Sequence, residues 1–259
     1  MMASERFSRI AELVNEKDFV STRDLSEQMK VSEPTIRKDL EELDRQGILL
    51  KVHGGARRLR QQMILTKGAE LDMSQRSRNQ RQKDAVARKA ASIVQDGDCV
   101  FLDGGTSVEQ MMPYLQGKKI RIVTHSLLIA QQFADPGSEL FALGGRYIPE
   151  YKMFVGPMTE QDLAKFNFDH AFIGCAGIDL AGKTAYTAEL DTMAIKQKAM
   201  DKAQKKYLLA DSSKLSIKGF CSFTDTDAFD AVFCDDGAQL GPDMIPDNCI
   251  LVHLPPQEA

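Results

Sequence analysis

The pattern of apolar and polar positions at the N-terminus predicts two short amphipathic helices. The first spans Glu5 to Glu16, and the apolar residues that share its inner face are Phe7, Ile10, Leu13 and Val14. The second begins at Thr22, whose hydroxyl suits a helix cap, and it turns Leu25 and Met29 inward. Lys30 and Val31 then form a tight turn into a third helix, so the chain opens with a helix-turn-helix arrangement.

The third helix is the most informative of the three. Ser32 is a good N-cap, while Glu33 and Pro34 suit a first helical turn. Its inward residues recur at helical spacing and are Ile36, Leu40 and Leu43. The opposite face is polar and carries Thr35, Arg37, Lys38 and Glu42, and Gly47 is expected to end the helix.

A basic hairpin is predicted directly after this helix. A short strand from Ile48 to Val52 leads to a Gly54-Gly55 turn, which is followed by two arginines. A short helix with cationic and hydroxyl groups at its start, followed by a basic wing, is how winged helix-turn-helix domains read a major groove and touch phosphates. The predicted DNA-contacting residues are Ser32, Glu33, Thr35, Arg37 and Lys38 on the helix, with His53, Arg57 and Arg58 on the wing.

The remaining chain divides into a linker and a larger α/β region. The stretch from Leu59 to Gln82 is rich in Arg and Gln without an apolar period, and it either lies near DNA or packs on the second domain. From about Lys83 a helix (Ala85 to Val94) introduces alternating strands and helices. The predicted strands are Cys99 to Leu102, Ile120 to Val123, Leu140 to Leu143, His170 to Gly174, Tyr207 to Ala210, Ala231 to Cys234 and Ile250 to Val252. The predicted helices between them are Val108 to Leu115, Leu127 to Phe133, Glu160 to Phe166 and Leu190 to Gln204. Apolar strands separated by helices favour a mostly parallel sheet that is covered on both faces.

Composition narrows the functional classes. The net charge is −4, so any nucleic-acid binding depends on a local patch, such as the four basic residues and no acid between Lys51 and Arg60. No apolar run is long enough for a membrane span and the N-terminus has no signal-peptide core, so we expect a cytoplasmic protein with no membrane partner. The five cysteines are scattered without a C-x-x-C and are expected to be free thiols, and the four histidines are too dispersed for a metal site.

Small polar residues follow several of the predicted strands. In an open parallel sheet, ligands bind beyond the carboxyl ends of the strands, where glycine turns and helix N-termini favour anions. The candidate ligand-binding residues at these ends are Asp103, Gly104, Gly105, Thr106, Ser107, Thr124, His125, Ser126, Gly144, Gly145, Arg146, Asp211 and Lys214. Two of them are ambiguous, because His125 is equally suited to a structural role and Asp103 suits either sugar hydroxyls or a turn cap.

These residues resemble a known family. The run V-S-E-P-T-I-R-K-D-L-E-E-L-D-R-Q-G, closing on H-G-G-A, is similar to the N-terminal domain of DeoR-type regulators of bacterial sugar metabolism. The runs D-G-G-T-S, T-H-S, L-G-G-R-Y, D-H-A-F-I-G-C-A-G-I-D and K-Q-K-A-M through L-L-A-D-S-S-K resemble its C-terminal effector domain. That domain is related in fold to ribose-5-phosphate isomerase and usually senses a phosphorylated sugar. The resemblance also implies Lys198 as a ligand contact. The chain departs from the family at His125, where Asn is more common, and at Ser107, where Thr is more common.

A sugar-phosphate isomerase with a DNA-binding head is the alternative function. Isomerisation needs a carboxylate base, and the isomerase motif carries aspartates where this chain has Gly174 and Gly177. Its glutamate base corresponds to Gln197, which is a poor proton acceptor, although Asp179 or Glu189 lies close enough to substitute. A pocket that binds without turnover is the simpler hypothesis, with no catalytic residue, metal or cofactor.

The sequence therefore predicts three segments and one function. Residues 1–58 form a winged helix-turn-helix domain, 59–82 a linker and 83–259 an α/β effector domain. We expect a DNA-binding transcriptional regulator, a repressor of a sugar-uptake or sugar-catabolic operon that a phosphorylated sugar relieves. One winged domain buries little surface, so a homo-oligomer on double-stranded operator DNA is expected.

Overall fold

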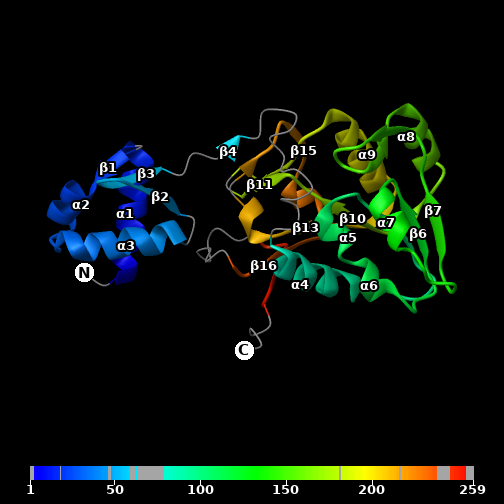
Figure 1. The fold of residues 1–259 in the computed structure, drawn as a ribbon, viewed down its shortest axis with the longest axis horizontal. Coiled ribbons are helices and arrows are strands. Elements are labelled where there is room, and N and C mark those ends of the chain that lie inside the picture. Colours follow the sequence, from blue (N-terminus) through cyan, green and yellow to red (C-terminus); the bar gives the residue numbers. More distant parts are fainter. Residues whose placement is uncertain are drawn as a thin grey trace. The chain divides into compact units, whose positions relative to one another are not determined.

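The chain folds into two compact units, which divide between Gln62 and Met63 (Figure 1). The computed structural model describes residues 3–17, 19–45, 48–58, 62–63, 79–180, 182–215, 217–237 and 246–254. The predicted helix stop at Gly47 and most of the predicted linker, including Arg76 and Arg78, lie outside these residues. No helix in the described ranges is long and apolar enough to cross a membrane.

Three helices form the core of the first unit. They are α1 (Ala3–Lys17), α2 (Thr22–Met29) and α3 (Glu33–Arg45). Their inward residues are fully or largely buried and include Ile10, Leu13, Leu25, Ile36 and Leu40. The cap of α2 differs from the prediction, because Ser21 accepts the backbone N–H of Asp24 at 3.0 Å. Thr22 is instead a buried residue of the first helical turn.

An ion pair that the sequence pattern did not indicate joins α1 to α3. The Arg6 guanidinium donates from Nη2 to Asp39 Oδ1 at 3.0 Å, and its Nε also reaches the other carboxylate oxygen. Both side chains are largely buried, with 11% and 8% of their surface exposed. Since a paired buried charge costs much less than an unpaired one, this contact fixes the orientation of α3 on the first helix.

The wing belongs to a three-stranded antiparallel sheet in which β3 is central. Its strands are β1 (Phe19–Ser21), β2 (Leu49–Val52) and β3 (Gly55–Arg58). The prediction included only the β2–β3 hairpin. Gly54 has φ +83° at the turn, and a Cβ at Gly55 would lie 2.3 Å from the carbonyl oxygen of Val20. The two glycines therefore serve the turn and the close approach of β1 to β3.

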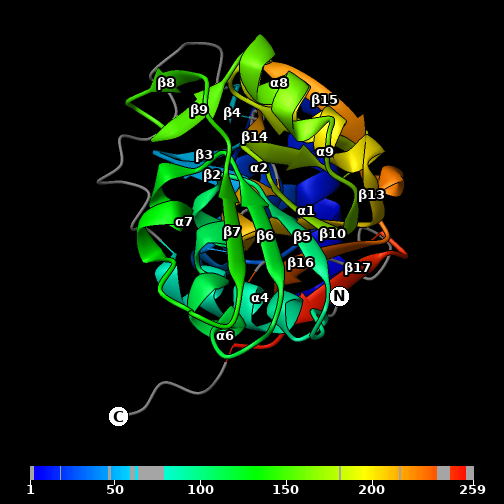
Figure 2. The ribbon, with the colours of Figure 1, turned by 90° about the vertical axis from the view of Figure 1, so that its right-hand side faces the viewer.

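Seven parallel strands form the central sheet of the second unit, as predicted. Their order is β17-β16-β13-β10-β5-β6-β7, and every neighbouring pair is parallel. They are β5 (Cys99–Leu102), β6 (Arg121–Thr124), β7 (Glu139–Ala142), β10 (Phe168–Gly174), β13 (Ala203–Ala210), β16 (Ala231–Asp235) and β17 (Cys249–Val252). Figure 2 shows β5, β6 and β7 side by side at one end of this sheet.

Helices cover both faces of the sheet. One face packs against α4 (Gln80–Ala91), α5 (Thr106–Glu109), α6 (Met112–Leu115) and α7 (Leu127–Gln132). The other packs against α8 (Pro157–Leu163) and α9 (Leu190–Asp201). Neighbouring residues of one strand alternate between the two cores, since Phe101 enters one while Val100 and Leu102 enter the other. This is why the strands read as continuous apolar runs.

Several small elements were missing from the sequence prediction. They are β4 (Gln62–Met63), β8 (Arg146–Ile148), β9 (Met153–Val155), β11 (Gly177–Asp179), β12 (Thr184–Thr187), β14 (Ile217–Lys218), β15 (Cys221–Asp225) and the short 3-10 helices Ser212–Lys214 and Thr226–Ala228. Strands β11, β12 and β15 form an antiparallel sheet, and β8 pairs with β9 as a hairpin. Each is short and lacks a long apolar period, so local pattern carried little information about them.

Several predicted helix boundaries differ from the structure, and α8 (Pro157–Leu163) begins and ends three residues before the predicted helix from Glu160 to Phe166. Helix α4 begins at Gln80, five residues before the predicted helix and inside the predicted linker. The predicted helix from Val108 to Leu115 is divided into α5 and α6, with Pro113 in the first turn of α6. Helix α9 ends at Asp201, and Gln204 already belongs to β13.

Candidate functional site

The polar face of α3 is accessible in the first unit. Arg37 and Lys38 are exposed, and Arg37 makes only an exposed ion pair with Glu33 at 3.3 Å. The Ser32 hydroxyl lies 2.9 Å from the Thr35 hydroxyl, while the Ser32 carbonyl accepts the first helical N–H groups. Exposed ion pairs contribute little to stability, so Arg37 can exchange Glu33 for another anion at small cost.

The wing presents a second basic surface. His53 is exposed in the turn, and Arg57 lies over the ring of Phe19, with its guanidinium carbon 5.8 Å from the ring centre. Arg58 pairs with Leu49 through the β2–β3 backbone. In the first unit, Arg37, Lys38 and Arg57 are thus exposed cations on a helix and a hairpin that share one small core.

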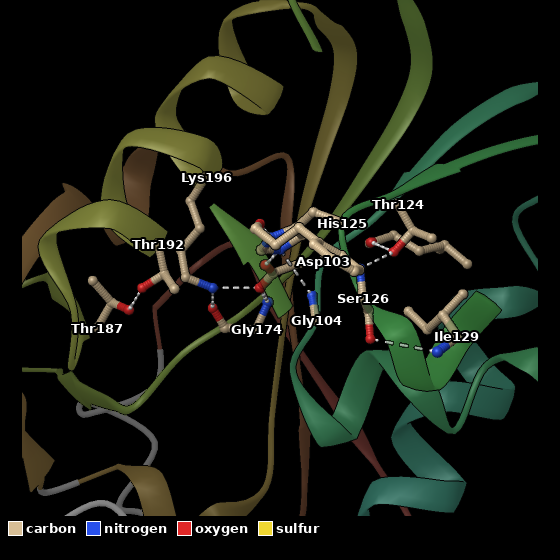
Figure 3. Close-up of polar contacts among 12 residues, drawn as sticks. Asp103, Gly104, Thr124, His125, Ser126, Ile129, Gly174, Thr187, Thr192 and Lys196 are labelled. Atoms are coloured by element: carbon tan, nitrogen blue, oxygen red, sulfur yellow. Dashed lines mark hydrogen bonds and ion pairs between the residues drawn. The ribbon is translucent and has the colours of Figure 1, made fainter. Parts of the chain in front are cut away.

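The second unit has a buried charged centre at the carboxyl end of β5. Asp103 follows this strand and is fully buried (Figure 3). Its Oδ2 accepts the backbone N–H of Gly174, the last residue of β10, at 2.8 Å, and it also accepts a hydrogen bond from Lys196 of α9. Lys196 Nζ donates in addition to the Gly174 carbonyl at 3.0 Å. One carboxylate therefore ties together two adjacent strand ends and the helix that covers them.

His125 completes this centre from the end of β6. Its Nδ1 donates to the Phe154 carbonyl at 2.8 Å, because a carbonyl oxygen can only accept. Its Nε2 lies 3.1 Å from Asp103 Oδ1 and 3.3 Å from the Gly104 backbone nitrogen. A proton on Nε2 makes the ring cationic and a donor to Asp103, whereas an unprotonated Nε2 accepts from Gly104. His125 is thus a buried, fully bonded histidine.

Lys196 and His125 determine the ionisation of Asp103. Burial by itself raises the pKa of this carboxyl, but Lys196 and His125 more than reverse that effect and hold the pKa well below its usual range. A carboxylate that is ionised and bonded on both oxygens is a poor proton acceptor. Asp103 consequently acts as an anchor of the strand ends.

Two glycines allow the strand ends to approach each other here. A Cβ at Gly105 would lie 3.3 Å from Gly174 Cα, and a Cβ at Gly174 would lie 3.4 Å from Asp103 Oδ2. Gly105 also accepts the first backbone hydrogen bonds of α5. Thr106 is half-buried and Ser107 is buried at the start of this helix. The D-G-G-T-S turn therefore meets the end of β10.

A further group of charges surrounds the Cys175 thiol, just past β10. Burial raises the pKa of this thiol to about 12, an effect opposed by Lys214 and Lys196 and reinforced by Asp211 and Asp103. Those four side chains come from the ends of β5 and β13 and from α9, so their charges converge at one place. The predicted residues Asp211 and Lys214 therefore act on the same thiol as Asp103 and Lys196.

Asp211 has an asymmetric environment. Its Oδ1 accepts hydrogen bonds from the Ser213 backbone, the Ser213 hydroxyl and the Asn79 side chain. Its Oδ2 is buried and has no hydrogen-bond partner among the residues that the structure describes. A buried carboxylate oxygen without a donor is costly, so this atom is a natural acceptor for a ligand hydroxyl.

Other predicted ligand residues have structural partners. The Thr124 hydroxyl donates to the Leu102 carbonyl at 2.7 Å and accepts from the Ser126 backbone, while the Ser126 hydroxyl caps α7 by accepting from Ile129. Gly144 accepts the Thr159 hydroxyl at 2.7 Å, and Gly145 has φ +143°. Arg146 pairs with Asp191 in the first turn of α9. These groups shape the loops around the centre more than they face it.

The lysine of α9 that enters the centre is Lys196. The resemblance implied Lys198 as the ligand contact, but the lysine that bonds Asp103 is Lys196. Lys198 lies two positions further along α9, about 200° around the helix. Lys196 is only 5% exposed. The neighbouring Gln197 donates its amide to the Phe223 carbonyl at 2.8 Å. In the described residues, no group of three His, Cys, Asp or Glu side chains could hold a metal ion.

Comparison with known proteins agrees with both halves of this description. Residues 6–62 match the DeoR-like helix-turn-helix domain, and residues 78–236 match the DeoR C terminal sensor domain. The chain belongs to the DeoR family. The predicted DNA-binding transcriptional regulator and its α/β fold class are thereby confirmed.

Curated DeoR-family relatives span nearly the whole chain. The lactose phosphotransferase system repressor of Streptococcus mutans is 31% identical over 91% of this chain and 93% of its own length. The repressor of the same name from Staphylococcus epidermidis is 32% identical over 89% and 91%. Among solved structures, ribose 5-phosphate isomerase A from Methanocaldococcus jannaschii is 18% identical, with a TM-score of 0.37 over 51% of this chain and 53% of its own.

Proposed function

We propose that this DeoR-family protein is a repressor of a sugar-uptake or sugar-catabolic operon, and that a phosphorylated sugar bound in the second unit releases it from DNA. The observation that carries the proposal is the buried polar centre at the ends of β5, β10 and β13, in a chain whose other unit exposes a cationic helix face. The similar repressors named for a lactose phosphotransferase system support a sugar that carries phosphate.

The chemistry of the centre fits the two parts of such a ligand. The Gly104-Gly105 turn leads into α5 and offers backbone N–H groups beside the Thr106 hydroxyl, which suit a phosphate or another anion. Lys214 adds a cation on the β13 side. The unpartnered Oδ2 of Asp211 suits a sugar hydroxyl. An anionic group near the turn and a polyol near Asp211 would together span the ends of β5, β10 and β13.

Turnover is not part of the proposed function. Aldose–ketose isomerisation needs a carboxylate that takes a proton, whereas Asp103 is ionised and engaged by Lys196, His125 and Gly174. Gln197 is bonded to the Phe223 carbonyl, and Asp179 is paired with Lys218 at 3.2 Å. Among the described residues, Glu189 keeps one buried oxygen without a hydrogen-bond partner. Glu189 is therefore the carboxylate to replace when isomerase activity is measured.

Repression follows from coupling between the two units. On the proposed mechanism, the protein acts in the cytoplasm as a homo-oligomer whose winged units read repeated half-sites, since a single unit buries too little surface for tight operator binding. The sugar phosphate reorders the turns at the strand ends and changes how two DNA-binding units are held. By linkage, operator DNA lowers the affinity for the sugar phosphate by the same factor.

A binding screen tests this proposal. The full chain is mixed with glucose 6-phosphate, galactose 6-phosphate, fructose 6-phosphate or ribose 5-phosphate, with inorganic phosphate and the free sugars as controls. A sugar phosphate at one hundred times its Kd should stabilise the second unit by about 2.7 kcal/mol in calorimetry. The same compound should release the protein from a DNA fragment taken from its own upstream region.

Three results would contradict the proposal. They are the absence of any sugar-phosphate effect on thermal unfolding, binding that leaves DNA affinity unchanged, and ketose–aldose interconversion of the bound compound. If turnover occurs and Glu189→Gln abolishes it, the isomerase function replaces the proposed one. Analytical ultracentrifugation with and without DNA measures the oligomeric state, and a monomer on the operator would contradict the half-site mechanism.

A further inference from the structure

We propose that binding of the sugar phosphate in the second unit is coupled to the uptake of a proton by His125. This inference rests on the proposed function and adds the regulation of the same site. The side chain of His125 is fully buried beside Asp103 and Gly104 (Figure 3). Because the ring is buried, its charge acts on a ligand through these two neighbours, so His125 is a positioning residue.

The two ring nitrogens of His125 differ in their freedom to change partner. Nδ1 donates to the Phe154 carbonyl, so it carries a proton whether the ring is neutral or cationic. Nε2 lies 3.1 Å from Asp103 Oδ1 and 3.3 Å from the Gly104 backbone nitrogen. Without a proton, Nε2 accepts from Gly104, whereas with a proton it donates to Asp103. One proton therefore changes both the charge of the ring and the partner of Nε2.

Protonation of His125 releases the backbone N–H of Gly104. This glycine is buried in the turn after β5, and a buried N–H that lacks an acceptor is costly. An oxygen of a bound anion can supply the missing acceptor, and it then competes with Nε2 for the same N–H. Protonation of His125 and binding of an anion at the turn consequently favour each other.

The net charge of the centre leads to the same conclusion. The charged side chains that converge on the thiol just past β10 are two acids and two bases, so their formal charges sum to zero; they are Asp103, Asp211, Lys196 and Lys214. A centre without net charge attracts an anion weakly, and a proton on His125 adds one positive charge. Even at about 10 Å and an effective dielectric constant of about 20, one unit charge changes the affinity for an anion on the order of tenfold.

The groups that face His125 keep their charge near neutral pH. From the end of β5 the ring faces Asp103, whose pKa is held well below its usual range, and beyond it Lys196 of α9. The adjoining elements β9 and α7 contain no titratable side chain, and Glu109 of α5 is bonded to Gln132 at the surface. Burial raises the pKa of the nearby Cys175 thiol to about 12. A charge change of the centre near neutral pH is therefore assigned to the imidazole.

The replacement His125→Asn tests the coupling in the full chain. Asparagine keeps an amide donor for the Phe154 carbonyl and has no titratable proton. The Kd of the sugar phosphate that binds wild type most tightly in the panel above is measured by calorimetry from pH 6 to pH 9. The second ionisation of the phosphate, near pH 6, is the same for both proteins and cancels in the ratio of their Kd values. The ratio of the His125→Asn Kd to the wild-type Kd should be about tenfold at pH 6 and fall below about twofold at pH 9.

His170→Asn is the matched control. His170 is also a largely buried histidine beside a carboxylate, with Nε2 3.2 Å from Asp98 Oδ2, but it lies near the amino end of β10. Its replacement should leave the Kd within about twofold of wild type at every pH, because it changes no charge at the ligand centre.

The proton itself is counted at pH 8, where the free sugar phosphate is already a dianion. Calorimetry in buffers of different ionisation enthalpy gives the number of protons taken up when the ligand binds. Wild type and His170→Asn should take up a measurable fraction of one proton per ligand, and His125→Asn should take up none.

The outcomes separate this inference from the proposed function. If none of the four sugar phosphates binds wild type, the proposed function fails and the coupling fails with it. If one binds and releases the operator while the Kd ratio stays constant with pH, the function stands and the coupling to His125 is wrong. Equal weakening of His125→Asn at every pH would give His125 a structural role only. Should His125→Asn fail to fold, the absence of proton uptake by wild type at pH 8 overturns the inference.

Discussion

Replacing Lys196 with methionine tests whether the buried charge pair holds the effector domain together. Methionine is close to lysine in length and fills the same space, but it removes the ammonium group. Asp103 would then keep the Gly174 N–H and His125 as partners, and the Gly174 carbonyl would lose its donor from Nζ. The carboxylate stays fully buried with its strongest counter-charge gone.

The expected loss of stability is large. Removing one partner of a buried ion pair destabilises a protein by about 3–5 kcal/mol, and we expect the lower end because two donors to Asp103 remain. For a domain of this size, about 3 kcal/mol corresponds to a fall in Tm of roughly 6–12 °C. Without Lys196, burial dominates and the pKa of Asp103 rises, so the Lys196→Met defect should shrink as the pH is lowered.

Differential scanning calorimetry of the full chain measures this change at several pH values. Lys198→Met is the matched control, because it deletes the same group from a half-buried lysine two positions away on the same helix. The double variant Asp103→Asn, Lys196→Met removes both charges and should recover part of the loss. Equal stability of Lys196→Met and Lys198→Met would refute the assignment of Lys196 to the buried centre.

Three further predictions concern the two units. Arg37→Ala should weaken operator binding by about 1–3 kcal/mol and leave sugar-phosphate binding intact. Arg9→Ala breaks a similarly exposed ion pair on α1 and should leave both operator binding and sugar-phosphate binding unchanged. Equal losses of operator binding in the two variants, measured by mobility shift, would contradict this. Gly105→Val should push the turn away from Gly174 and give a repressor that the sugar phosphate no longer releases, and a normal release curve would place the ligand elsewhere. Because the pKa of Asp103 is lowered in the folded protein, its contribution to stability is present above about pH 4 and is lost as the pH falls further. The difference in free energy of unfolding between wild type and Asp103→Asn, measured by urea titration, should therefore narrow from pH 5 to pH 2.

Local pattern was sufficient for the elements with long apolar periods. The inward face of α3 and all seven strands of the parallel sheet could be predicted, because helical spacing and continuous apolar runs reflect packing on one side or on both. The turn at Asp103 was also predictable, since strand ends in a parallel sheet meet at one edge. The short antiparallel strands around β12 were not, because three or four residues carry no distinct period.

The sequence by itself determined the family, the two-unit organisation and the strand ends that form the centre. Only the tertiary structure decided which lysine of α9 enters it, because both Lys196 and Lys198 lie among apolar and polar neighbours on a helix without a clear polar face. The bond between Asn79 and Asp211, 132 positions apart, was likewise beyond local pattern. Spacing along the chain specifies which face of an element is buried, whereas partners that distant meet only through the packing of the whole domain.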